Sequence, residues 1–259
     1  MDLGISGRTA IVCASSRGLG RACAESLAAN GVDVVINGRD TAMLEKTTQA
    51  LRGRFNVKVT PVVADVSTPH GQKALLDACP SPDILVNNNG GPPLKPYLDV
   101  TREDLLAGAI QNMVTPIELF QKVLPGMRER SFGRIVNITS TSVRMPILGL
   151  DVSSAARAGL TAFLAGPARD VARHNVTVNA VMPGMFDTDR LRGSTAKMAE
   201  MRGKPREEMA AERAASVPAK RFGRPEEVGE LVAFLCSAQA GYITGQSLLI
   251  DGGLFNSVT

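Results

Sequence analysis

Short apolar runs rich in β-branched residues alternate along the whole chain with longer stretches of helical periodicity. Such short runs are typical of buried strands, and the longer stretches have the spacing of helices that pack along one face. Strands that alternate with helices predict a parallel sheet covered by helices on both faces. The expected strands span residues 9–14, 32–38, 57–64, 83–87, 134–138, 176–181 and 247–253, and the expected helices span residues 21–31, 41–52, 70–78, 102–130, 152–174 and 225–237.

No linker rich in Pro, Gly or Ser interrupts this series, and no internal repeat is present. The chain of 259 residues therefore predicts one α/β domain over residues 1–259, a Rossmann-like doubly wound parallel sheet. A polar, charged insertion at residues 187–222 falls outside the alternation. We expect it to form a small substrate lid beside the carboxyl ends of the strands, where such sheets bind ligands.

The positive charge of the chain is concentrated near this lid. The net charge is +4, and residues 190–224 hold ten Lys and Arg residues against four Asp and Glu residues. Binding of nucleic acid would require a basic stripe on a recognisable module, and the sequence shows no such module. The basic segment therefore predicts either a phosphate-bearing or acidic small-molecule substrate or a solvated helical face.

Neither a membrane segment nor a metal site is expected. No apolar run approaches the roughly 20 residues of a membrane span, and the N-terminus lacks a signal-peptide pattern. We therefore expect a cytoplasmic protein without a membrane partner. The four cysteines lack CxxC spacing and there are two histidines, so buried free thiols are the better interpretation.

A glycine-bearing turn joins the first expected strand to the first expected helix. Backbone N–H groups in such a turn, together with the positive end of the helix dipole, bind a pyrophosphate. Its position in an α/β chain favours a dinucleotide site over a tight turn alone. The turn residues expected to contact the cofactor are Ser15, Ser16, Arg17, Gly18, Leu19 and Gly20.

The cofactor type depends on the residues that follow the second expected strand. Asn37-Gly38-Arg39 lacks the acid that usually accepts from the ribose hydroxyls of NAD. Arg17 and Arg39 could instead face a 2′-phosphate, for which a guanidinium is well suited. This favours NADP(H) over NAD(H), and the alternative is that both arginines are simply exposed.

These motifs resemble the short-chain dehydrogenase/reductase family over essentially the full chain, in particular the β-ketoacyl-acyl-carrier-protein reductases. The family's opening TGxxxGxG pattern matches residues 13–20, with Ala14 in place of its first glycine, and its NNAG turn matches residues 87–90. The C-terminal signature matches residues 225–228 and 242–253. The resemblance implies that further cofactor contacts come from Asp65, Val66, Asn88, Gly90, Pro183, Gly184 and Thr188.

The resemblance also implies a catalytic asparagine, serine, tyrosine and lysine, and the sequence departs from the last two. Asn112 and Ser140 match the asparagine and the serine. Ser153, 13 residues after Ser140, replaces the tyrosine, and Arg157 replaces the lysine. Residues four apart share one face of a helix, so Ser153 and Arg157 can reach each other. A serine hydroxyl is far less acidic than a phenol, and arginine stays protonated.

Two other side chains are candidates for the missing proton donor. Tyr97, close to Lys95 in sequence, lies in a loop after the fourth expected strand, which lines the active-site mouth in this fold. Asp151 lies at the expected edge of the pocket, where burial could raise its pKa. No lysine occurs between Lys122 and Lys197, so none nearby in sequence replaces the missing one.

Three functions are compatible with this sequence, and the first is favoured. It is NADP-dependent reduction of a 3-oxoacyl thioester or another ketone. Ser140 and Arg157 would polarise the carbonyl, and water held by Asn112 and Ser153 would supply the proton. The second is a catalytically inactive nucleotide-binding homologue that acts as a sensor or partner subunit. The third is dehydration or isomerisation with a structural nucleotide. The resemblance further implies a homotetramer, or alternatively a dimer.

Overall fold

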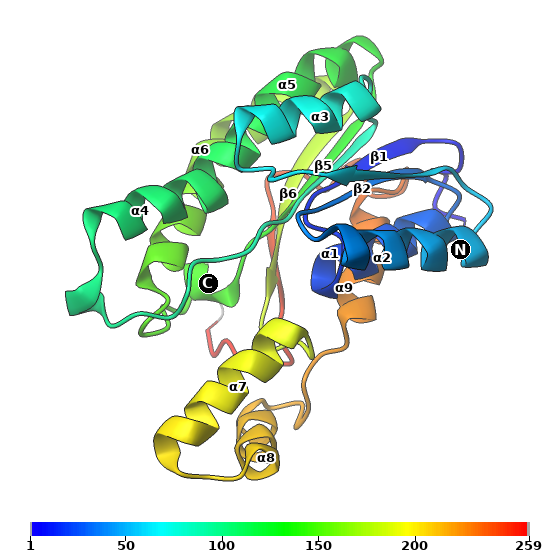
Figure 1. Ribbon diagram of the computed structural model, residues 1–259. Coiled ribbons are helices and arrows are strands. Elements are labelled where there is room, and N and C mark those ends of the chain that lie inside the picture. The colour runs from blue at the N-terminus through cyan, green and yellow to red at the C-terminus, as the bar shows by residue number, and fades with distance from the viewer. Residues whose placement is uncertain (1, 258–259) are drawn as a thin grey trace.

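The computed structural model describes residues 2–257, in which a seven-stranded parallel sheet is flanked by helices (Figure 1). The strand order is β3-β2-β1-β4-β5-β6-β7. The predicted α/β fold is therefore confirmed. The strands are β1 (Thr9–Val12), β2 (Asp33–Gly38), β3 (Val59–Val63), β4 (Ile84–Asn87), β5 (Gly133–Ile138), β6 (Val176–Pro183) and β7 (Ser247–Ile250).

Helices cover both faces of the sheet because successive strand residues are apolar on opposite sides (Figure 1). In β1, Ala10 and Val12 pack into the core shared with α1 and α9, whereas Ile11 packs into the core shared with α5 and α6. Neither face of the sheet is left to solvent, which explains the continuous apolar runs in the sequence. The helices that cover the faces are α1 (Gly18–Ala29), α2 (Thr41–Arg54), α3 (Pro69–Ala78), α5 (Thr115–Glu129), α6 (Asp151–Val171) and α9 (Pro225–Leu235).

The long helix predicted before the fifth strand is divided in the structure. α4 (Arg102–Ala109) leads into a π-helical turn, η2 (Ile110–Val114), and then into α5 (Thr115–Glu129). Pro116 stands in the first turn of α5, where its missing N–H group breaks the regular α-helical bonding. Such π-helical turns are often found at functional sites, and this one holds Asn112 in a buried position.

Residues 187–222 fold into two helices, α7 (Asp189–Arg202) and α8 (Arg206–Ser216), that project beyond the carboxyl end of β6 (Figure 1). Arg213 of α8 lies against α7 and donates from Nη1 to the hydroxyl of Thr195 at 2.6 Å. This bond joins the two helices into a hairpin next to the predicted cofactor side of the sheet.

All four cysteines are buried free thiols, as predicted. Burial raises the pKa of both Cys13 and Cys23 to about 12, so these thiols stay protonated at neutral pH. Residues 2–257 hold no cluster of His, Cys, Asp and Glu that is placed to bind a metal ion. Within the same range, no helix combines the length and the apolar character that crossing a membrane requires.

Candidate active site

The turn after β1 leaves backbone donors free at the start of α1. Arg17 occupies the N-cap position, and no side chain caps the first turn of the helix. The first N–H groups of a helix have no internal acceptor, and the helix dipole favours an anion there. Gly18 adopts the left-handed region, with φ of 60°, and so turns the chain into the helix. This cradle fits the pyrophosphate of a dinucleotide.

Ser15 differs from its neighbours because it is fully buried. Its hydroxyl donates to the Val12 carbonyl at 2.7 Å and accepts from the Asn37 N–H group at 2.9 Å. The Ser15 side chain therefore holds β1 to β2 instead of facing a ligand. Ser16 and Leu19 are partly buried, and Leu19 packs against the core.

The turn is packed closely around two small residues. Ala14, at the position of the missing glycine, adopts a left-handed backbone with φ of 45°. A Cβ atom at Gly20 would lie 2.4 Å from the Ala14 carbonyl oxygen and 2.6 Å from Nδ2 of Asn88. Asn88 donates to that same carbonyl at 3.1 Å. Gly20 therefore allows α1 to approach the end of β1, and Asn88 ties this turn to the loop after β4.

Arg17 and Arg39 are mostly exposed, with side-chain exposures of 65% and 77%. Arg39 Nη1 lies 3.5 Å from Oδ2 of Asp65, and Arg17 Nη1 lies 4.0 Å from Oδ2 of Asp189. The pKa of Asp65 is lowered mainly by the hydrogen bond from the Ser67 hydroxyl, and further by the charge of Arg39. Both guanidinium groups remain accessible to solvent or to a phosphate.

A cavity of about 190 Å³ lies between the loops that follow β2, β3 and β4. Arg39 and Asp65 line it together with Gly90 and Gln111. Val66, which follows Asp65 in the chain, is buried. Three predicted cofactor contacts, Arg39, Asp65 and Gly90, thus line one cavity.

The turn after β6 faces the turn after β1. Pro183 ends β6, and a Cβ atom at Gly184 would lie 2.7 Å from the Cβ of Asp251, so the backbone approaches closely there. The Thr188 side chain caps α7. A Cβ atom at Gly18 would lie 3.7 Å from the Thr188 methyl group. The two turns predicted to hold the cofactor therefore meet at the carboxyl edge of the sheet.

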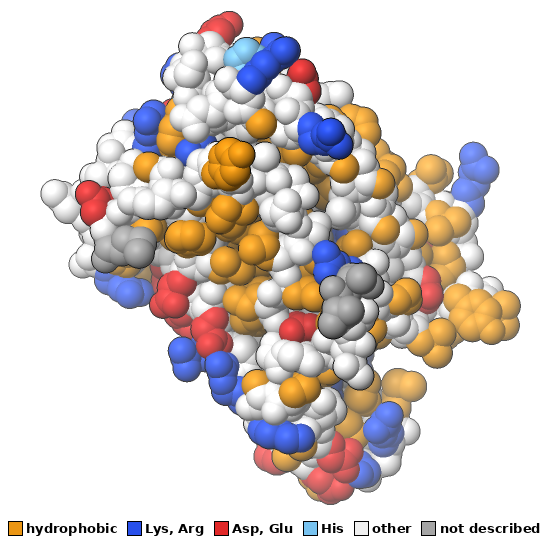
Figure 2. Space-filling model, turned by 180° about the vertical axis from the view of Figure 1, so that it is seen from behind, with side chains coloured by type: hydrophobic (Ala, Val, Ile, Leu, Met, Phe, Trp, Pro, Cys, Tyr) orange, Lys and Arg blue, Asp and Glu red, His pale blue; other side chains and the backbone are white. Residues whose placement is uncertain are grey.

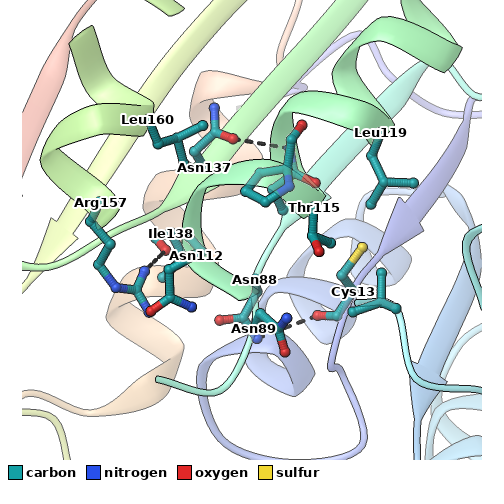
Figure 3. A pocket seen from close by; sticks show the side chains of 13 residues that line it. Cys13, Asn88, Asn89, Asn112, Thr115, Leu119, Asn137, Ile138, Arg157 and Leu160 are labelled. Carbon is teal, nitrogen blue, oxygen red and sulfur yellow. Dashed lines mark hydrogen bonds between the residues drawn. The ribbon is translucent and has the colours of Figure 1, made fainter. Parts of the chain in front are cut away.

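Three of the four predicted catalytic residues form one hydrogen-bonded chain. Ser153 Oγ donates to Oδ1 of Asn112 at 3.3 Å, and Arg157 Nε donates to Ser153 Oγ at 3.1 Å. At one end, Asn112 Nδ2 donates to the Gly90 carbonyl at 3.0 Å. At the other end, Arg157 Nη1 donates to the Ile138 carbonyl at 2.6 Å, as Figure 3 shows. All three side chains are buried. We refer to them as the Asn112–Ser153–Arg157 network.

The network carries a positive charge that no carboxylate neutralises. Within residues 2–257, no salt bridge joins Arg157 to an acid. Burial and, to a smaller extent, the nearby charge of Arg190 together lower the pKa of Arg157 to about 10. Arg157 is still protonated at neutral pH. The network therefore offers a fixed positive charge and a weakly acidic hydroxyl, not a phenol.

Ser140, the fourth predicted catalytic residue, lies just beyond the end of β5. Its hydroxyl accepts from the Ser142 N–H group at 3.1 Å and caps the short helix η3 (Thr141–Val143). In the described part of the chain, no hydrogen bond joins Ser140 to the network. It lies two residues after Ile138, whose carbonyl binds Arg157, so it borders the same site.

The two alternative proton donors lie apart from the network. Tyr97 is 61% exposed, and Lys95 forms an ion pair with Asp104 instead of facing Tyr97. Asp151 is exposed and accepts from the Gly149 N–H group at 3.0 Å. The structure shows no hydrogen bond from Tyr97 or Asp151 to the network among the described residues.

Arg190, at the start of α7, is a site residue that the sequence does not identify. It donates from Nη1 to the Gly91 carbonyl at 3.3 Å and from Nη2 to the Pro92 carbonyl at 3.2 Å. These bonds connect the lid to the loop after β4. Because both acceptors belong to the backbone of a distant loop, no residue pattern marks them.

A small cavity of about 20 Å³ lies behind Arg157 and is lined by asparagines (Figure 3). Asn87 and Asn137, at matching positions of β4 and β5, are joined by a hydrogen bond of 2.9 Å. Oδ1 of Asn87 and Oγ1 of Thr115 are buried and have no hydrogen-bond partner among residues 2–257. The cavity has room for about one water molecule that could bind them.

Comparisons with known proteins agree with this geometry. A family model described as "Enoyl-(Acyl carrier protein) reductase" matches residues 13–255. The chain is 33% identical to the 3-oxoacyl-[acyl-carrier-protein] reductase FabG of Aquifex aeolicus (strain VF5), over 98% of this chain and 100% of the relative. It is 30% identical to the NADPH-dependent reductase BacG of Bacillus subtilis (strain 168), over 98% of this chain and 100% of the relative.

A solved structure shows the same arrangement of elements. The L-sorbose reductase of Gluconobacter frateurii, complexed with NADPH and L-sorbose, superposes with a TM-score of 0.94 at 30% sequence identity. The superposition covers 100% of both chains. Sequence and structure comparisons thus match the chain over nearly its full length.

Proposed function

The chain belongs to the short-chain dehydrogenase/reductase family and is an NAD(P)-dependent oxidoreductase, and we propose that it uses NADPH to reduce a ketone. The substrate would be a 3-oxoacyl thioester or another small-molecule carbonyl. The observation that carries the proposal is the Asn112–Ser153–Arg157 network, which binds the Gly90 carbonyl in the loop that Asn88 ties to the turn after β1. The reductases among the relatives support it.

The cofactor would lie along the carboxyl edge of the sheet. The N–H groups at the start of α1 bind the pyrophosphate, and Arg17 and Arg39 bind the 2′-phosphate. Asp65, Val66, Asn88 and Gly90 shape the adenosine side, and Pro183, Gly184 and Thr188 shape the nicotinamide side. Bound there, NADPH supplies the hydride.

The protein residues polarise the carbonyl and place the proton source. Ser140 donates to the carbonyl oxygen, and Arg157 stabilises the negative charge that develops on it. A water molecule held by Asn112 and Ser153 delivers the proton. Without a phenol, the reaction lacks its usual general acid, and such a loss costs about 10²- to 10⁴-fold in rate. We therefore propose slow turnover.

A second candidate function is a nucleotide-binding protein without catalysis, which acts as a sensor or partner subunit. One observation favours it: Ser153 and Arg157 are hydrogen-bonded to each other, and neither Tyr97 nor Asp151 bonds to them among the described residues. A protein of this kind would bind NADPH and keep its fold without turning over a carbonyl.

Oxidation of NADPH by the purified protein separates the two functions. The substrates are acetoacetyl thioesters and small ketones, and the double variant Ser153→Tyr/Arg157→Lys runs in parallel. We expect slow but measurable oxidation by the natural chain and faster oxidation by the double variant, because the phenol supplies the missing acid. Activity in the double variant alone would favour the non-catalytic function.

The cofactor preference is tested by titrating NADPH and NADH separately. We expect NADPH to bind about tenfold more tightly, because two guanidinium groups near the 2′-phosphate add charge-assisted bonds. Arg39→Gln should remove most of this preference, whereas Lys46→Gln on the exposed surface of α2 should not. Tighter binding of NADH by the natural chain would contradict the assignment.

We also propose that the single domain assembles as a homotetramer, with a dimer as the alternative. Exposed apolar side chains lie on α4 and η2, at Leu106, Ile110 and Val114. Two others, Phe234 and Tyr242, precede the edge strand β7 in the chain. Hydrophobic side chains also gather on the face of the molecule shown in Figure 2. Light scattering after size-exclusion chromatography gives the mass directly; a monomer would contradict this proposal.

A further inference from the structure

We propose that Arg157 and Arg190 make the site selective for substrates that carry a free carboxylate next to the carbonyl. These substrates are 2-oxo or 3-oxo carboxylic acids, in preference to neutral ketones and thioesters. The inference rests on the proposed function for its reaction and names the substrate class within it.

The charge of Arg157 is unmatched among the described residues. Its side chain is 9% exposed, and its two partners, the Ser153 hydroxyl and the Ile138 carbonyl, are neutral. A buried cation without a counter-charge is costly, and proteins usually pair it. The charge therefore needs an anion that the described residues do not provide.

The guanidinium group of Arg157 is held in a fixed orientation. The bonds from Nε and Nη1 fix its plane, and Nη2 meets no acceptor among residues 2–257. Arg157 reaches from α6 toward Asn112 and the Ile138 carbonyl at the lining of the cavity (Figure 3). A fixed guanidinium with a free edge suits the planar, two-oxygen geometry of a carboxylate.

Arg190 supplies a second positive charge near Arg157. Its guanidinium holds the Gly91 and Pro92 carbonyls, while Asn112 holds the Gly90 carbonyl. Arg190 is near enough to disfavour the charged form of Arg157. Arg190 thus binds this loop directly, and Arg157 is connected to it through Ser153 and Asn112. An anion close to both cations would offset their repulsion.

The nearby acids are already engaged elsewhere. Asp187 and Asp189 accept from Arg192 at 2.6 Å and 2.8 Å, respectively. Asp151 is exposed and accepts from the backbone of Gly149. These carboxylates therefore do not neutralise the two arginines, and the inference assigns that role to a carboxylate of the substrate.

Isothermal titration calorimetry with acetoacetate and its uncharged methyl ester tests the inference. Each is titrated into the full chain, with and without saturating NADPH, at one ionic strength. We expect acetoacetate to bind about tenfold or more tightly than the ester. Arg157→Met should abolish this preference, Arg157→Lys should keep part of it, and Arg190→Gln should reduce it several-fold. The control, Arg169→Met on the exposed face of α6, should leave it unchanged.

Equal binding of acid and ester by the natural chain would overturn the inference, as would a preference that survives both Arg157→Met and Arg190→Gln. If Arg157→Met does not fold, Arg157→Lys and the exposed Arg190→Gln decide the matter. NADPH oxidation with the ester or a thioester, but not with acetoacetate, would overturn the inference and leave the proposed function standing. Failure to bind NADPH would instead contradict the proposed function, and the titrations without cofactor would still decide the inference.

Discussion

Ser153 and Arg157 lie four residues apart on α6, and a direct hydrogen bond joins them. The sequence predicts this contact because helical spacing alone places the two side chains together. The bond from Arg157 to the Ile138 carbonyl could not be predicted, since it depends on how α6 lies against β5. The residue pattern therefore identifies the pair, and only the packing shows that the arginine lacks a counter-charge.

Ala14 is a residue whose backbone conformation costs stability. It adopts φ of 45°, a region that costs a residue with a Cβ atom about 1–2 kcal/mol. We expect Ala14→Gly to raise the free energy of unfolding by about 0.5–1 kcal/mol, since the greater entropy lost by glycine on folding offsets part of the relief. Urea denaturation measures the change.

The control for this substitution is Ala162→Gly in the exposed middle of α6. There glycine should lower the free energy of unfolding by about 0.8–1 kcal/mol, because it weakens a regular helix. A loss of stability in Ala14→Gly of the same size as in the control would show that Ala14 is not strained.

At the scale of elements, Glu227 connects the end of the lid to α9. Its carboxylate accepts two bonds from Arg221, at 2.7 Å and 2.8 Å, and one from the Arg224 N–H group at 2.7 Å. These contacts, the Arg221 hydrogen bonds first among them, lower its pKa to about 2 from an ordinary 4.5. A group with a lowered pKa in the folded state stabilises the protein above the ordinary value and loses this effect as the pH falls.

We therefore expect Glu227→Gln to lower the free energy of unfolding by about 1 kcal/mol at neutral pH, since the ion pair is partly exposed to solvent. It should also flatten the fall of stability between about pH 4.5 and pH 2. Thermal unfolding across that range is the measurement. Glu226→Gln, one position earlier and exposed, is the control; an equal change in both variants would contradict this account.

The sequence predicts most elements because their apolar periods are long and regular. It does not predict the η2 turn, because a single extra residue in a helix changes the apolar period too little to be seen. Similarly, Ser15 belongs to the predicted cofactor turn, but its inward orientation depends on the pairing of β1 with β2. Local patterns thus locate the site, and contacts between strands decide which side chains face it.

At the scale of the whole molecule, Arg190 connects the α7–α8 hairpin to the loop after β4. Both of its hydrogen bonds end on that loop, and they bridge the edge where the cofactor is proposed to bind. We expect Arg190→Ala to increase amide hydrogen exchange a few-fold in α7 and in residues 91–95, because the hairpin opens more often.

Mass spectrometry of the exchanged peptides measures this effect. Lys197→Ala, an exposed change on the same helix, should leave the exchange unchanged. Added NADPH should slow exchange in both segments if the cofactor fills the bridged edge. Unchanged exchange in Arg190→Ala would show that the hairpin is held by its packing alone.

The strand order has a consequence for how the chain assembles during synthesis. From β1 the sheet grows one way through β2 and β3, and the other way through β4, β5, β6 and β7. Every strand after the first is thus made when a neighbour that it pairs with already exists, and none has to be inserted between two finished strands. A nascent chain can therefore add each new strand at an open edge of the sheet as it leaves the ribosome. Each added strand pairs with the previous edge strand, whose free backbone groups would otherwise be open to aggregation.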